Sequence, residues 1–131
     1  MHLVFTTKNR EPILTKEIRA RVFDHIIDNA KSKGIYLKAV NGYNDHIHCL
    51  LSLNRELSIS KTAQLIKGES SYWINKNKLC EKKFTWQDDY WAVAVSESHV
   101  KKVENYIQNQ EEHHQRKSFK DEIGNLVNKN N

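Results

Sequence analysis

The chain has 131 residues, of which 21 are Lys or Arg and 16 are Asp or Glu, so its formal net charge is +5. This length suits a single domain spanning residues 1–131 with one modest core, and the positive charge favours polyanionic partners such as nucleic acids. No run of about 18 apolar residues and no signal-peptide pattern occurs, so no membrane association is expected. The two cysteines, Cys49 and Cys80, offer no disulfide framework and no Cys-x-x-Cys metal site, which favours the reducing cytoplasm.

The first half of the chain predicts three strands and one helix. Apolar residues at helical spacing follow Thr15, a typical N-cap residue, and Gly34 ends this pattern as a C-terminal glycine does. A turn at 41–45 separates two strand-like runs, which favours an antiparallel hairpin. In chain order we expect a strand at 2–7, a helix from 16 to 33, a strand at 35–40 and a strand that begins at 46.

The second half predicts a helix, a strand and a final helix. Ser58 or Ser60 begins the first helix, and Gly68 interrupts it at a cost of roughly 1 kcal/mol relative to alanine. A polar connection at 77–87 leads to a strand at 90–95, and Ser98 is the expected N-cap of the last helix. The order β-α-β-β-α-β predicts an α+β fold of the ferredoxin-like type, an antiparallel sheet covered on one face by two helices, followed by a C-terminal helix.

The most informative motif is His46-Ile47-His48 in the strand that follows the hairpin turn. Side chains at positions i and i+2 share one face of a strand, so both imidazoles can bind one cation while Ile47 packs on the other face. The alternative is a pair of ordinary histidines in a half-buried strand, because metal binding requires a third donor.

The last predicted helix, at 98–116, carries further candidate residues. Tyr106 and Gln110 stand four positions apart and therefore lie on one side of the helix, next to its apolar stripe. Together with two strand imidazoles they could form a site in which a hard cation polarises a phosphodiester while Tyr106 attacks phosphorus. Each also has a plain structural interpretation, with Tyr106 packed against a neighbour and Gln110 solvated. His113, His114 and a metal-bound water are candidate bases for the tyrosine proton.

Four segments in the same order resemble the small transposases that carry a His-hydrophobic-His (HUH) motif and one catalytic tyrosine, including their REP-associated relatives. The segments are HLVFTTKNREP at 2–12, DHIH at 45–48, KGESS at 67–71 and VENYIQNQ at 103–110. The resemblance covers most of the chain and implies the same ferredoxin-like fold.

The resemblance also implies the chemistry. It assigns His46, His48 and Gln110 as ligands of a divalent metal ion, Mg²⁺ or Mn²⁺, and Tyr106 as the nucleophile. The implied activity is cleavage and rejoining of single-stranded DNA at hairpin-associated sites through a 5′-phosphotyrosine intermediate. The implied assembly is a homodimer in which the tyrosine helix completes the histidine pair within its own subunit or in the partner. No small-molecule substrate is expected.

Basic and aromatic residues outside this site are candidate DNA contacts. Lysine and arginine bind phosphates, an interior glycine admits a close backbone, and a tryptophan in a loop can stack on bases. The candidates are Lys8, Arg10, Lys61, Lys67, Gly68, Lys82, Lys83 and Trp86.

Two other phosphoryl-transfer classes do not fit the pattern. A histidine-triad hydrolase would have a third alternating histidine where this chain has Leu50, and a phosphoesterase with two His-x-Thr/Ser motifs would have a second copy. The alternative that remains is a domesticated relative that binds hairpin DNA or RNA without transposition activity.

Overall fold

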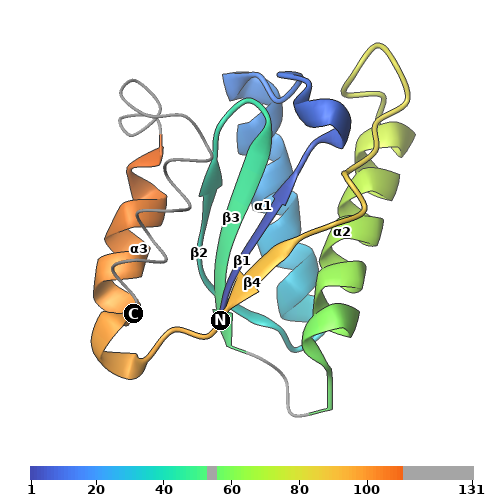
Figure 1. Cartoon of the computed structure of the whole chain (residues 1–131). Coiled ribbons are helices and arrows are strands. Elements are labelled where there is room, and N and C mark those ends of the chain that lie inside the picture. Colours follow the sequence, from blue (N-terminus) through green and yellow to red (C-terminus); the bar gives the residue numbers. More distant parts are fainter. Residues whose placement is uncertain (53–55, 111–131) are drawn as a thin grey trace.

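The protein is described by a computed structural model over residues 1–52 and 56–110 (Figure 1). In these ranges four strands form one antiparallel sheet in the order β2-β3-β1-β4. The elements are β1 (His2–Thr6), the 3-10 turn η1 (Lys8–Arg10), α1 (Lys16–Ser32), β2 (Tyr36–Gly42), β3 (His46–Ser52), α2 (Ile59–Lys76), β4 (Trp91–Val93), the 3-10 turn η2 (Glu97–His99) and α3 (Val100–Gln108). This order and pairing confirm the predicted ferredoxin-like arrangement.

The two faces of the sheet have different covers. Alternate residues of the central strands, such as Phe5 and Ile47, pack with α1 and α2 in the main core. On the opposite face Leu50 joins a smaller cluster with Val103 and Ile107 of α3. Figure 1 shows α3 on one side of the sheet and α1 and α2 on the other. The helix α3 therefore covers the face that α1 and α2 leave open.

Local capping explains where two of the helices begin. The Thr15 side chain accepts a hydrogen bond from the Ile18 amide at 3.4 Å, and the Ser58 side chain accepts one from the Lys61 amide at 3.0 Å. Gly34, just beyond α1, has a φ of 74°, a conformation that glycine adopts at little cost. The predicted N-cap Thr15 and, of the two serines considered, Ser58 are confirmed.

The predicted start of the last helix at Ser98 is wrong. Residues 97–99 form the 3-10 turn η2, and α3 begins at Val100. The Ser96 and Ser98 hydroxyls lie 2.6 and 3.3 Å from His99 Nδ1, so the chain turns around a histidine ring before the α-helix forms. The predicted residues 111–116 of this helix lie outside the described ranges.

The hairpin turn between β2 and β3 is tighter than predicted. β2 continues to Gly42, where a strand had been expected to end at residue 40. A Cβ atom on Gly42 would lie 2.1 Å from the His46 carbonyl oxygen, so this position admits no side chain without a shift of the backbone. A Cβ on Gly68, in contrast, would meet no atom within 4 Å in the part of the chain that the structure describes.

None of the helices in the described ranges is both long and apolar enough to cross a membrane.

We predict that Gly42→Ala lowers the free energy of unfolding by about 1–3 kcal/mol, because the added methyl group displaces the turn that leads into β3. Gly68→Ala is the matched control, and improved helix propensity should raise the same quantity by about 0.5–1 kcal/mol. Urea unfolding of both variants and the wild-type protein measures the two effects. A Gly42→Ala variant as stable as the wild type would contradict the close approach at this turn.

Candidate active site

His46 and His48 lie side by side on the face of β3 that α3 covers. Both side chains are fully buried, and their ring centroids are 5.0 Å apart. Their odd-numbered neighbours Ile47 and Cys49 belong to the main core on the opposite face. The strand is thus anchored by apolar packing on one face while it presents two imidazoles on the other, as the spacing predicted.

A carboxylate orients the first imidazole. Asp45 Oδ1 lies 2.7 Å from His46 Nδ1, and Asp45 Oδ2 lies 3.6 Å from Arg10 Nε. Because an ionised carboxylate can only accept hydrogen bonds, Nδ1–H of His46 is the donor in this contact. The Nε2 nitrogen of neutral His46 then carries the lone pair, which points away from Asp45. Arg10, a predicted DNA contact, is half exposed and also belongs to this edge of the site.

The helix α3 places Tyr106 and Gln110, the other two predicted site residues, beside the histidines. Asn41 Nδ2 donates to the Gln108 carbonyl at 3.0 Å and so ties the end of α3 to β2. Gln110 is fully buried, and its Oε1 lies 3.2 Å from His46 Nε2 while its Nε2 donates to the Tyr106 carbonyl. The half-buried Tyr106 ring lies with its centroid 6.0 Å from that of His48. All four residues predicted for the metal and the nucleophile therefore meet within one chain.

These donors fit a divalent cation. Two neighbouring ligands of an octahedral ion at about 2.1 Å are about 3.0 Å apart, close to the 3.2 Å between His46 Nε2 and Gln110 Oε1. His46 Nε2 and Gln110 Oε1 both have lone pairs for a cation when the His46 proton is on Nδ1 and is donated in a hydrogen bond to Asp45. Within residues 1–52 and 56–110, no group of three or more His, Cys, Asp or Glu side chains has a geometry suited to a metal ion. Gln110 Oε1 is a donor of a different type beside the two imidazoles.

A third histidine completes the cluster. His2 Nε2 of β1 lies 2.8 Å from His48 Nδ1, and the His2 ring is fully buried. Burial lowers the pKa of His2 to about 3, so this imidazole is neutral at ordinary pH. Sequence reasoning assigned no role to His2 or Asp45. The Asp-His dipeptide was a usable signal for Asp45, whereas the place of His2 depends on the register of β1 against β3.

Comparison with known proteins identifies the family. Residues 1–110 match the family described as "Transposase IS200 like". The chain belongs to this family. The transposase is 27% identical over 114 residues to the ISDra2 transposase TnpA of Deinococcus radiodurans, covering 83% of this chain and 81% of that relative. The resemblance stated from the sequence is thereby confirmed.

Solved structures agree with the fold. A crystal structure from Deinococcus radiodurans R1, assigned as a transposase, has a TM-score of 0.67 at 26% identity and covers 83% of this chain and 88% of that one. The structure of a REP-associated tyrosine transposase bound to a REP hairpin has a TM-score of 0.60 at 17% identity, covering 82% and 63% of the two chains. The second likeness supports the fold alone.

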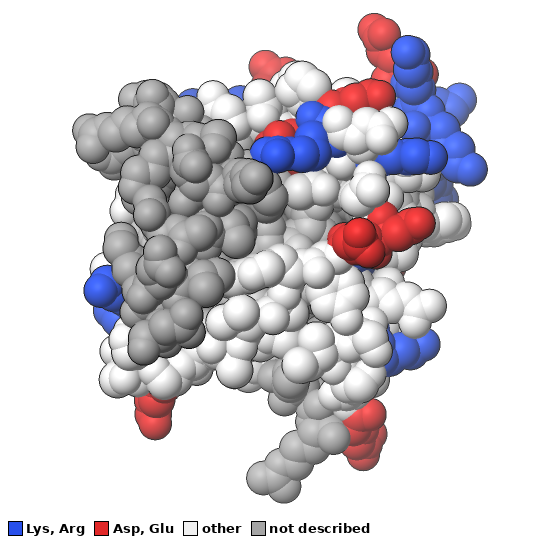
Figure 2. Space-filling model, viewed as in Figure 1, with Lys and Arg blue, Asp and Glu red and all other residues white. Residues whose placement is uncertain are grey.

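Three of the predicted DNA-binding lysines of the transposase line one cavity of about 840 Å³. Lys8 comes from η1, and Lys82 and Lys83 come from the loop between α2 and β4. Figure 2 shows Lys and Arg side chains gathered at the upper right, over the region where Figure 1 places this loop. Lys61 is exposed on the first turn of α2, outside the lining of this cavity.

Lys67 and Trp86, two of the predicted DNA contacts, are already engaged by other parts of the protein. The Lys67 ammonium donates to the carbonyls of residues 87, 88 and 89 at 2.6, 2.8 and 3.4 Å, so it closes the loop before β4. Trp86 is only 7% exposed, its Nε1 donates to Ser70 at 3.0 Å, and Phe5 packs edge-on against its ring. Its stacking surface is therefore part of the core. Gly68 lines a separate cavity of about 370 Å³ beside Lys67, and among the described residues nothing outside its own helix lies within 4 Å of where its Cβ would be.

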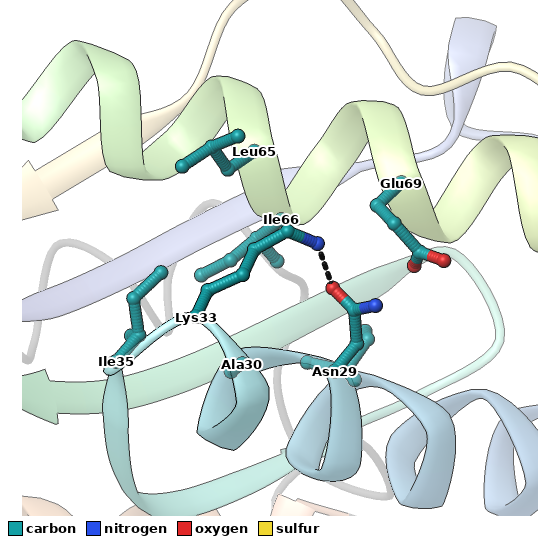
Figure 3. Close-up of a pocket in the computed structure, with 8 residues that line it drawn as sticks. Asn29, Ala30, Lys33, Ile35, Leu65, Ile66 and Glu69 are labelled. Atoms are coloured by element: carbon teal, nitrogen blue, oxygen red, sulfur yellow. Dashed lines mark hydrogen bonds between the residues drawn. The ribbon is translucent and has the colours of Figure 1, made fainter.

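A small cavity between α1 and α2 lies on the core side of the sheet (Figure 3). Its volume of about 10 Å³ would hold about one water molecule, and Lys33 donates a hydrogen bond to Asn29 within its lining. It is separated from the histidines by the sheet itself, so it is no part of the site. The candidate bases His113 and His114 lie outside the described residues.

We predict that acid destabilises the transposase through His2. The unfolded chain takes up a proton there near the ordinary pKa of 6.5, whereas the folded protein resists protonation until about pH 3. Because the unfolded state binds more protons between these values, the free energy of unfolding falls as pH drops below about 6.5, by up to about 1.4 kcal/mol per pH unit. Urea unfolding at several pH values measures this slope, and His2→Gln, which lacks the titrating group, should show a shallower one. Equal slopes would contradict the prediction.

Proposed function

We propose that this transposase cuts and rejoins single-stranded DNA through a covalent link between Tyr106 and a 5′-phosphate. The observation that supports this most is the contact of Gln110 Oε1 with His46 Nε2 at 3.2 Å, because the same helix carries Tyr106 beside His48. Tyrosine-dependent phosphodiester chemistry requires a nucleophile close to a set of donor atoms that can hold a metal ion.

The proposed cofactor is Mg²⁺ or Mn²⁺ held by His46, His48 and Gln110. Such an ion, when bound, withdraws charge from the scissile phosphate and stabilises the transition state by several kcal/mol. Two nitrogen ligands favour Mn²⁺ over Mg²⁺. Asp45 supports the ligand set by fixing the ring of His46.

Tyr106 performs the bond exchange. Its phenolic oxygen loses a proton and forms a bond to phosphorus, while the bond from phosphorus to the 3′-oxygen breaks and that oxygen leaves as a 3′-hydroxyl. The product is a 5′-phosphotyrosine in which the phosphodiester energy is retained. A 3′-hydroxyl from another strand then attacks phosphorus and restores the tyrosine hydroxyl, so no ATP is consumed.

The proposed substrate is a single strand folded into a hairpin. A structural neighbour is bound to a REP hairpin. On this chain, three lysines (Lys8, Lys82 and Lys83) and two glutamates (Glu11 and Glu81) line one cavity, so its lining carries a small net positive charge. Phosphates of the hairpin would contact this cavity.

The proposed assembly is a homodimer. Mixing Tyr106→Phe with His46→Ala subunits tests where each active site is completed. Cleavage by the mixture indicates that the tyrosine acts on the partner's histidines, whereas an inactive mixture of proteins that exchange subunits indicates a site within one chain.

We predict that Tyr106→Phe abolishes the covalent adduct, a loss of at least about 1000-fold, while hairpin binding stays within about twofold. Labelled hairpin-bearing strands, Mn²⁺ and a denaturing gel measure the adduct. Tyr72→Phe is the matched control, because Tyr72 is an exposed tyrosine on α2. A chelator should abolish the wild-type adduct.

The same experiment distinguishes the alternative function. If wild-type protein binds hairpin DNA or RNA but forms no adduct with any strand, the chain is a domesticated binding module. In that case Tyr106→Phe leaves its binding activity unchanged.

We predict that the double variant Lys82→Ala/Lys83→Ala weakens hairpin binding and lowers the slope of log K against log salt by about 1.4–1.8, the contribution of two phosphate contacts. Lys31→Ala, an exposed lysine of α1, is the control and should leave the slope within error. Fluorescence anisotropy over a range of salt concentrations measures both. An unchanged slope in the double variant would exclude this cavity from the DNA-binding surface.

A further inference from the structure

His2 is held rigidly against His48. β1 pairs with β3 so that Val4 faces His48, and His2 is the next residue on the same face of β1. The two imidazoles stack with centroids 5.1 Å apart, and Trp91 meets the His2 ring edge to face at 5.0 Å. With no exposed surface, the His2 ring keeps its nitrogen at a fixed place beside His48 Nδ1.

The position of one proton decides whether His48 can bind a metal. A neutral imidazole carries its proton on either Nδ1 or Nε2, and only the unprotonated nitrogen has a lone pair for a cation. His48 Nδ1 is engaged by His2 Nε2 at 2.8 Å, so the nitrogen available to a ligand site is Nε2. In a neutral His48, Nε2 lacks a proton only when the proton is on Nδ1. Nδ1–H then donates a hydrogen bond to His2 Nε2.

We propose that His2 is a positioning residue that accepts a hydrogen bond from His48 Nδ1–H and thereby fixes the tautomer in which His48 Nε2 can bind the metal. This role rests on the proposed metal site. It parallels the contact of Asp45 with His46 Nδ1, but with a neutral acceptor in place of a carboxylate. A neutral acceptor orients the second ligand without adding negative charge near the phosphate of the DNA.

The environment of His2 supports a functional role over simple packing. Its other nitrogen, Nδ1, is buried and has no hydrogen-bond partner among the described residues. A buried polar atom left in this way costs about 1–3 kcal/mol, which an apolar side chain at the same place would avoid. The contact with His48 is therefore a reason for a histidine at this position that core packing does not provide.

The tautomer is measured directly in the metal-free protein. Long-range ¹H–¹⁵N NMR of the imidazoles at neutral pH should show His48 protonated at Nδ1 and unprotonated at Nε2. In His2→Phe, which keeps a ring of similar size but no acceptor, His48 should shift toward the Nε2–H tautomer. His2→Gln provides an amide oxygen as acceptor and should retain the Nδ1–H form.

Manganese affinity, followed by electron paramagnetic resonance, is the second readout. We expect a 10- to 100-fold loss in His2→Phe and recovery to within about fivefold of wild type in His2→Gln. Val4→Ala is the matched control, because it removes buried methyl groups directly opposite His48 but no hydrogen bond, and it should change the affinity less than about threefold.

Each failure has its own meaning. Wild-type protein that binds no Mn²⁺ overturns the proposed metal site and the role of His2 with it. Mn²⁺ binding that is equal in wild type and His2→Phe, or a His48 that carries its proton on Nε2 in the wild type, overturns the role of His2 and leaves the metal site standing. A Val4→Ala variant that loses as much affinity as His2→Phe shows that packing alone accounts for the effect.

Discussion

The packing of α3 on the histidine-bearing face of the sheet is the contact on which the site depends. Val103 and Ile107 of α3 are almost fully buried against Leu50 and its neighbours. Burial of side chains of this size contributes about 1.5–3 kcal/mol each, enough to hold a short helix in one place. This packing is what brings Tyr106 and Gln110 to the imidazoles. Without it they would share a helix face but have no fixed relation to the strand.

The sheet separates stability from chemistry by the alternation of its side chains. In β3, Ile47 and Cys49 enter the core formed with α1 and α2, while His46 and His48 face α3. The buried side is apolar and well packed, so the backbone that carries the imidazoles is rigid. A site on a rigid strand holds its donors more accurately than a site on a loop. Asp45, directly before β3, and His2 of β1 each contact one of the two imidazoles.

Predictions from the sequence succeeded where the pattern is local and failed where it is not. The caps of α1 and α2 and the common face of His46 and His48 follow from a few consecutive residues. Trp86 was expected in a loop open to DNA, but an isolated bridge to Thr7 directs its ring into the core. Lys67 was expected to contact phosphate, but the loop before β4 supplies carbonyl oxygens that accept hydrogen bonds from its ammonium group. Both outcomes depend on segments far apart in the chain.

The sequence by itself determined which side chains can act together within one element. The strand period places His46 beside His48, and the helical period places Tyr106 beside Gln110. Only the tertiary structure decided that these two pairs meet and that His2 lies against the second imidazole. The physical reason is that neighbours across strands and between layers follow from register and from the packing of distant apolar residues, which no short sequence pattern encodes.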